Sequence, residues 1–167
     1  MGTSRLTNLQ KRWQPAEIST SATKGFQKVV LGELNDHSVN QRQSEWDNTT
    51  KGAITKPFVP KTADRLKMKI NVTPNLTTMV TGHGNIKSYL HKYKIIDSPM
   101  CSCKSGEQTV DHILFDCKLL EQERDSLKAA VLRSENWPVS KDKLINKYNK
   151  NCKKFTNNIG FINYSEQ

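Results

Sequence analysis

The chain has 167 residues, of which 35% are hydrophobic, and a formal net charge of +10. This length predicts one domain, or one small domain with a tail, and the low apolar content predicts a modest core. No stretch approaches the roughly 20 apolar residues that cross a bilayer, which argues against a membrane protein. The excess of 26 basic over 16 acidic residues favours a polyanionic partner.

The N-terminal segment, residues 1–21, is polar and is predicted to be disordered. No secretory leader pattern is found in it, so we expect an intracellular protein, nuclear and/or cytoplasmic, with reduced thiols. The next apolar residues recur at helical spacing and predict a long helix from residue 22 to about 48: Phe26, Val29, Val30 and Leu34. Glycine and proline then mark a linker, at Gly52, Pro57 and Pro60.

Three short helices are predicted between this linker and residue 94, capped in turn by Thr62, Thr73 and Asn85. Pro74 at the first helical position and Gly82 after the last bound the second of them. The third carries an apolar stripe that we assign to the core: Ile86, Tyr89, Leu90 and Tyr93. If the two tyrosines were exposed instead, they could stack on nucleic-acid bases.

Three cysteines and a histidine fall within 17 residues: Cys101, Cys103, His112 and Cys117. Such a Cys₃His set is among the usual tetrahedral ligand sets of structural Zn²⁺, so we predict a zinc site here. Pro99 and Gly106 bracket the first cysteine pair in a turn. Four ordinary residues, with buried thiols and a solvated histidine, or a disulfide set, are the alternatives.

His112 is expected on a short helical run that Thr109 caps and that ends at Cys117. Positions five apart on an α-helix differ by about 140° in direction. Both side chains would therefore not reach one ion from a regular helix. We predict that the helix unwinds or bends before Cys117.

Two further helices are predicted after the cysteine region. The first has leucines and Val131 inside, with Glu121, Glu123 and Arg124 outside. The second begins after Ser140, is rich in lysine, and has Cys152 on its apolar stripe as a core thiol. The predicted fold is thus mainly α, with several short helices around a small core and a zinc-stapled loop. We assign 22–56 to the long helix and connector, 57–139 to a helical zinc-motif domain, and 140–167 to a basic helix and tail.

The order of these motifs resembles the C-terminal tail of the pol proteins of insect non-LTR retrotransposons. Residues 81–117 contain, as in that family, a TGHG turn, a Tyr-Leu helix, a DSP-x-Cys-x-Cys turn and a His-x₄-Cys helix. Residues 45–60 are similar to the Trp-containing connector that follows RNase H in such proteins. The resemblance covers roughly residues 22–132 and places the family's zinc motif on the same four cysteine and histidine residues.

The resemblance implies a parent polyprotein with endonuclease, reverse transcriptase and RNase H domains. The chain carries none of the carboxylate clusters with which those enzymes hold metal ions, so we expect no enzymatic activity of its own. It is similar to an isolated tail of a retroelement, which leaves a non-functional fragment as one alternative.

The function we expect is zinc-dependent binding of RNA and/or DNA, with lysines on the phosphates. The candidate lysines are Lys87, Lys92, Lys94, Lys104, Lys118, Lys147, Lys150, Lys153 and Lys154. The alternative, from another functional class, is a module for protein interaction or for folding of the polyprotein. It would act through self-association or through contact with the parent chain. Binding that weakens with salt would distinguish the first function from the second.

Overall fold

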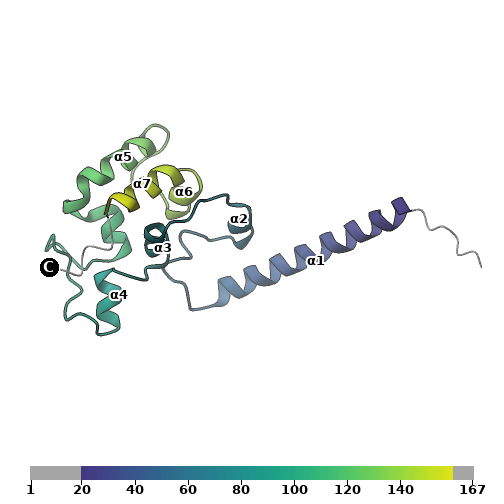
Figure 1. Cartoon of the computed structure of the whole chain (residues 1–167), viewed down its shortest axis with the longest axis horizontal. Helices are drawn as coiled ribbons and strands as arrows, with labels where there is room; N and C mark the ends of the chain where they lie inside the picture. Colours follow the sequence, from purple (N-terminus) through teal and green to yellow (C-terminus); the bar gives the residue numbers. More distant parts are fainter. Residues whose placement is uncertain (1–19, 160–167) are drawn as a thin grey trace, which may run out of the picture. The chain divides into compact units, whose positions relative to one another are not determined.

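The computed structural model describes residues 20–159. Most of the segment 1–21, for which the sequence predicts disorder, lies outside the described residues, as does the end of the chain from residue 160. The chain divides into two units, residues 1–44 and 45–167. Within the described residues the only extended pairing is an isolated antiparallel bridge between Met100 and Glu107. The predicted mainly α fold is confirmed (Figure 1).

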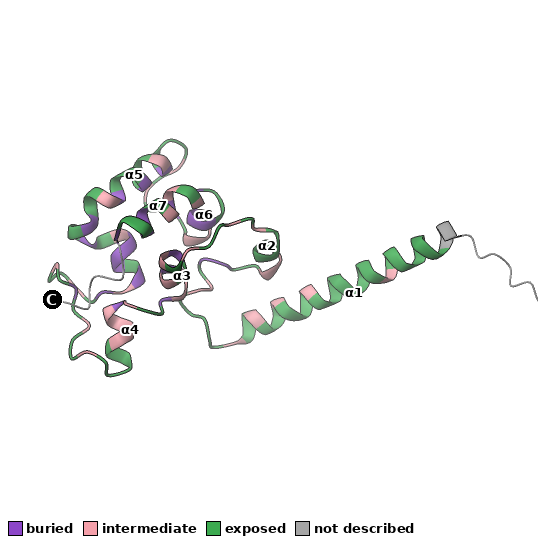
Figure 2. Cartoon of the chain, in the orientation of Figure 1, coloured by how far each residue is buried: buried purple, intermediate pink, exposed green. Residues whose placement is uncertain are grey.

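The first unit contains most of α1 (Thr20–Asn48), the long helix predicted from the sequence. Its large apolar side chains are exposed rather than packed: Phe26 is 71% exposed and Leu34 is 60% exposed. Figure 2 shows exposed residues along most of the helix. The helix therefore buries little apolar surface of its own.

The second unit contains the remaining helices: α2 (Thr62–Lys67), α3 (Pro74–Thr81), α4 (Lys87–Lys92), the π-helix η2 (His112–Asp116), the 3₁₀ turn η3 (Lys118–Leu120), α5 (Glu121–Leu132), α6 (Lys141–Asn146) and α7 (Asn149–Ile159). The helix α7 packs against α3, α5 and α6, and each of these helices carries buried residues (Figure 2). Phe155 and Cys152 of α7 are fully buried. Cys152 is thus a core thiol, as predicted, and burial raises its pKa to about 12.

The segment predicted as a linker is part of the core of the second unit. Phe58 has no exposed surface, and Val59 is buried beside it. The indole Nε1 of Trp46, in the last turn of α1, donates a hydrogen bond of 2.9 Å to the carbonyl oxygen of Val59. The apolar residues between the glycine and proline positions therefore anchor this segment.

The caps of the short helices differ in part from the sequence prediction. Thr73 caps α3 as predicted, because its Oγ1 accepts a hydrogen bond from the amide of Leu76. Thr62 is the first residue of α2 rather than its cap, and Asn85 does not cap α4. At α4 the first amide, of Lys87, instead donates to the side-chain oxygen of Gln108 at 2.9 Å. A distant residue thus replaces the local cap.

The apolar stripe of α4 is only partly buried. Ile86 is 1% exposed, but Tyr93 is 57% exposed, so its assignment to the core was wrong. The physical reason is that α4 ends at Lys92, and Tyr93 lies beyond the last turn that faces the core. Tyr93 therefore has the exposed ring that stacking on a nucleic-acid base would require.

The lysine-rich segment forms two helices, α6 and α7, in place of the single helix predicted. Glu135 lies in the loop after α5 and pairs with Lys143 at 2.5 Å and with Lys147 at 2.7 Å. The hydroxyl of Tyr148, at the break between the two helices, lies 2.8 Å from the Oγ of Ser134. These polar contacts connect the segment between α6 and α7 to the loop at the end of α5.

Replacing Glu135 with glutamine should destabilise the protein near neutral pH. Hydrogen bonds from Lys143 and then Lys147 lower the pKa of Glu135 from 4.5 to about 2, so the stabilisation is present above pH 4.5 and is lost as the pH falls toward 2. The difference in urea midpoint between the parent and Glu135→Gln should therefore shrink between about pH 7 and about pH 3. The control is Asp125→Asn. The carboxylate of Asp125 is exposed and forms no ion pair with any residue that the structure describes. A difference independent of pH would contradict the prediction.

Candidate metal centre

A tight turn brings Cys101 and Cys103 to one side of the chain. The amide of Cys101 donates to the carbonyl of Gly106 at 2.9 Å, and the amide of Lys104 donates to the carbonyl of Cys101 at 2.9 Å. Lys104 takes the left-handed conformation, with φ of 61°, at the tip of this turn. The turn predicted between Pro99 and Gly106 is therefore present.

The other two ligand candidates lie at the start and just past the end of the π-helix η2. The hydroxyl oxygen of Thr109 accepts a hydrogen bond of 3.2 Å from the amide of His112, which is the predicted cap. The amide of Cys117 donates to the carbonyl of His112 at 2.7 Å, which is the five-residue hydrogen bond of a π-helix. The helix therefore widens where we predicted unwinding or bending, and Cys117 then adopts an extended conformation.

All four candidate ligand atoms lie within 4.8 Å of one another. The sulfurs of Cys101 and Cys117 are 3.7 Å apart, and the sulfur of Cys103 lies 3.1 Å from Nε2 of His112. A tetrahedral zinc with Zn–S bonds of about 2.3 Å would place two sulfurs about 3.8 Å apart. The geometry of these side chains therefore fits a metal ion with four N/S ligands.

The electrostatics of the two turn cysteines differ. Burial raises the pKa of the Cys101 thiol to about 12, whereas the hydrogen bond with Ser105 lowers the pKa of the half-buried Cys103 to about 6. A thiolate at Cys101 is thus unfavourable without a nearby cation. Since thiolates are the metal-binding form of cysteine, a bound cation would supply the missing stabilisation.

Arg124 of α5 is a residue of this site that sequence reasoning missed. It was assigned to the outside of its helix but is 6% exposed. Its Nε donates to the carbonyl of Leu114 at 2.7 Å, and its Nη2 donates to the carbonyls of Ile113 at 3.0 Å and Cys117 at 2.9 Å. The guanidinium therefore fixes the backbone at the end of η2, including the backbone of Cys117, which is a candidate ligand.

A sequence signal for Arg124 was available. It lies four residues after Leu120 and three before Leu127, two buried leucines, and so occupies the apolar stripe of its helix. An arginine on such a stripe has to find acceptors in the core. Here the backbone carbonyls of Ile113, Leu114 and Cys117 provide them.

Five of the nine candidate lysines lie on segments around the cluster. Lys87 connects α4 to the turn, because its ammonium lies 3.3 Å from the Oγ of Ser102. Lys104 is at the tip of the turn, and Lys118 directly follows Cys117. Lys92 and Lys94 are exposed at the end of α4.

The other four candidate lysines lie on the C-terminal helices. Lys147 is engaged by Glu135, which raises the pKa of its ammonium. Lys150, Lys153 and Lys154 lie on α7, where Lys153 is half-buried and the other two are exposed. Lys147 is thus less available to a phosphate than the three lysines of α7.

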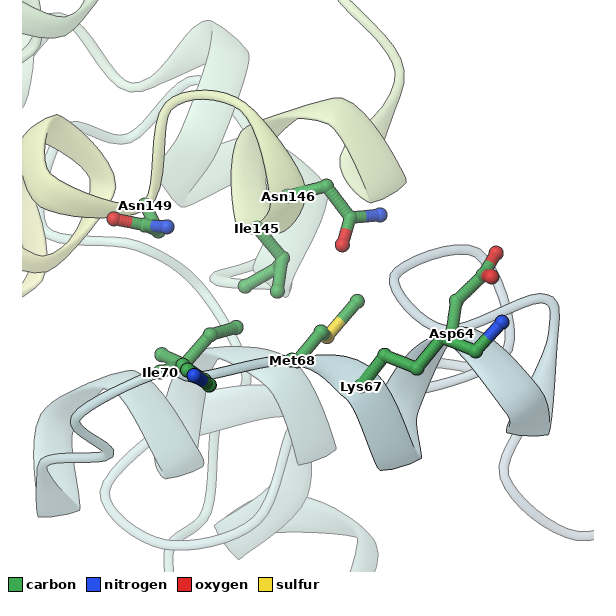
Figure 3. Close-up of a pocket in the computed structure, with 8 residues that line it drawn as sticks. Asp64, Lys67, Met68, Ile70, Ile145, Asn146 and Asn149 are labelled. Atoms are coloured by element: carbon green, nitrogen blue, oxygen red, sulfur yellow. The ribbon is translucent and has the colours of Figure 1, made fainter.

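A separate pocket of about 380 Å³ lies between the end of α2 and the α6–α7 region (Figure 3). Met68 and Ile145 point toward each other across it, with Asn146 and Asn149 on one side and Lys67 on the other. The pocket contains none of the predicted metal ligands or nucleic-acid-binding lysines. Among the helices of residues 20–159, none is long and apolar enough to cross a membrane.

The chain is similar in sequence to several known proteins. Over 86 residues the chain is 33% identical to a retrovirus-related Pol polyprotein from the type-1 retrotransposable element R1 of Bradysia coprophila, a match that covers 50% of the chain and 8% of that relative. The corresponding R1 protein of Popillia japonica is 34% identical over 80 residues, covering 43% of the chain and 33% of the relative. The homologues of this chain are R1 retrotransposon Pol polyproteins.

A further R1 Pol polyprotein, from Nasonia vitripennis, is 28% identical over 101 residues, or 59% of the chain and 26% of the relative. The resemblance to retrotransposon pol proteins is thus confirmed. The chain spans a third or less of the length of these R1 Pol relatives, so it corresponds to a part of such polyproteins. No protein-family model and no solved structure matches the chain significantly.

Proposed function

We propose that this chain is a zinc-dependent nucleic-acid-binding accessory segment of a retrotransposon reverse transcriptase polyprotein. The observation that carries the proposal is the Cys₃His cluster, whose four ligand atoms lie within 4.8 Å of one another. A set of three thiolates and one imidazole favours Zn²⁺ over harder cations such as Mg²⁺. Four protein ligands fill a tetrahedral site, so the ion would have a structural role.

In this proposal the zinc ion holds the turn and η2 together, and lysines on the surrounding segments contact phosphates. Three thiolates, one imidazole and Zn²⁺ carry a formal charge of about −1. The attraction for nucleic acid therefore comes from the lysines near the site and from those of α7. Residues 57–139 would carry the zinc motif, and the helices from residue 140, which share the core of the same unit, would add the second basic surface.

The lysines near the site can be tested through the salt dependence of binding. Replacing Lys92, Lys94 and Lys104 together with glutamine should reduce the slope of log affinity against log salt by about 0.7 to 0.9 for each lost phosphate contact. The slope is measured by fluorescence anisotropy with a labelled oligonucleotide at several salt concentrations. Zinc content should not change, because none of the three is a ligand candidate.

The matched control replaces Lys24, Lys28 and Lys51, which makes the same change in net charge outside the proposed surface. This variant should keep a slope close to that of the parent. Binding that does not depend on salt, or an equal loss in the control, would argue against a localised nucleic-acid surface.

One observation favours the alternative of a protein-interaction module. Exposed apolar side chains share one side of α1, with Phe26 at 71% and Val29 at 60%, and form a helix surface that a partner protein could cover. A pull-down of the parent polyprotein that depends on Phe26, together with salt-independent nucleic-acid binding, would favour this second function.

A further inference from the structure

Three aromatic rings form a continuous group at α4. The ring of His83 lies 4.9 Å from that of Tyr89, and the ring of Tyr89 lies 4.8 Å from that of Tyr93, measured between centroids. Tyr89 and Tyr93 are four residues apart, so a helical turn sets their contact. The interplanar angles of 43° and 54° are those of tilted aromatic pairs.

The outer ring of this group is available to a ligand. Tyr93 is 57% exposed, Tyr89 is half-buried and His83 is exposed. The contact with Tyr89 supports Tyr93 from one side. A supported and exposed aromatic ring can stack on a planar ligand without a large loss of side-chain entropy.

The charges around the rings favour an anion. Residues 83–104 contain four lysines and one acidic residue, Asp97. Lys92 and Lys94 flank Tyr93 in sequence, and Lys94 takes the left-handed conformation with φ of 57°. A stacking ring between two cations matches the alternation of base and phosphate along a nucleic-acid strand.

We propose that Tyr93 stacks on an unpaired base of single-stranded nucleic acid, with Tyr89 and His83 behind it and with Lys92 and Lys94 on the neighbouring phosphates. This inference rests on the proposed nucleic-acid-binding function and adds the class of ligand. In a duplex the faces of the bases are covered by their neighbours, whereas in a single strand they are free to stack on a side chain.

The test compares two labelled DNA strands of about 12 nucleotides, a length within the range that such single-strand sites cover. One strand carries normal bases, and the other carries abasic sites, so that both have the same number of phosphates. The parent protein should bind the normal strand about tenfold more tightly than the abasic strand. Tyr93→Leu should bind both strands with the affinity that the parent has for the abasic one, whereas Tyr93→Phe, which keeps the ring, should behave as the parent does.

The outcomes separate this inference from the function on which it rests. Salt-dependent binding with equal affinity for both strands, or a Tyr93→Leu variant that still prefers the normal strand, would overturn base stacking and leave the nucleic-acid function in place. Absence of binding by the zinc-loaded parent to either strand, and also to an RNA strand and a DNA duplex of the same length, would overturn both. An unchanged circular dichroism spectrum and zinc content in Tyr93→Leu verify its fold, which the exposure of Tyr93 leads us to expect.

Discussion

Replacing Cys103 with serine is expected to release the bound metal and to unfold the chain between about residues 97 and 120. The turn that carries Cys103 is held by few hydrogen bonds and one isolated bridge, so it has little other support. Structural zinc contributes on the order of 10 kcal/mol to folding, which is comparable with the whole stability of a small domain. Metal analysis should find about one zinc per chain in the parent and much less in the variant. Amide hydrogen exchange should show the loss of protection in this region.

The fourth cysteine provides the matched control for this experiment. Cys152 is buried, as are Cys101 and Cys117, but it lies in α7 and does not belong to the cluster. Cys152→Ala should lose some stability through a small cavity and should retain its zinc. If reduced, natively purified parent protein contains no zinc, or if Cys103→Ser retains it in full, the zinc proposal is wrong.

Replacing Arg124 with methionine is expected to cost about 3 kcal/mol of unfolding free energy and to weaken zinc binding about 10- to 100-fold. The guanidinium donates to three backbone carbonyls at the end of η2, and methionine leaves these buried acceptors without those donors. The positive charge also lies close to a site whose zinc-bound form would be negative. Urea denaturation and competition with a chelator measure the two effects.

Two further variants identify what Arg124 contributes. Arg124→Lys keeps the charge but cannot reach three carbonyls at once, so it should recover only part of the loss. Arg133→Met removes an exposed arginine just past the end of the same helix and should change neither quantity. Unchanged zinc affinity in Arg124→Met would show that the backbone of η2 does not need this support.

Several features of the structure follow from local sequence rules. Thr73, Pro74 and Gly82 define α3 because cap, first-turn and left-handed positions are decided within a few residues. The grouping of the four candidate ligands could also be predicted, since ligand chemistry within 17 residues leaves few arrangements of the chain. Cys152 was separated from them correctly by its position on an apolar stripe.

The errors arise where a distant residue replaces a local one. Asn85 has the chemistry of a cap, but Gln108 takes this role from 21 positions beyond Lys87. Arg124 has the chemistry of a surface residue, but it is buried and donates hydrogen bonds to carbonyls of η2. Tyr93 fits the helical period, yet its helix ends one residue earlier. The spacing of apolar residues along the sequence does not predict tertiary contacts of this kind.

The π-helical turn has a consequence for how this segment tolerates mutation. Four residues separate His112 from Cys117, and the five-residue hydrogen bond between them accommodates one residue more than an α-helical turn would. Substitutions at Asp116, which is exposed, leave this length unchanged. A deletion or insertion between the two ligand candidates would alter the register itself, and every residue from Cys117 to the start of α5 would rotate with it. The segment is therefore constrained in its length as well as in its buried residues, Ile113 and Leu114.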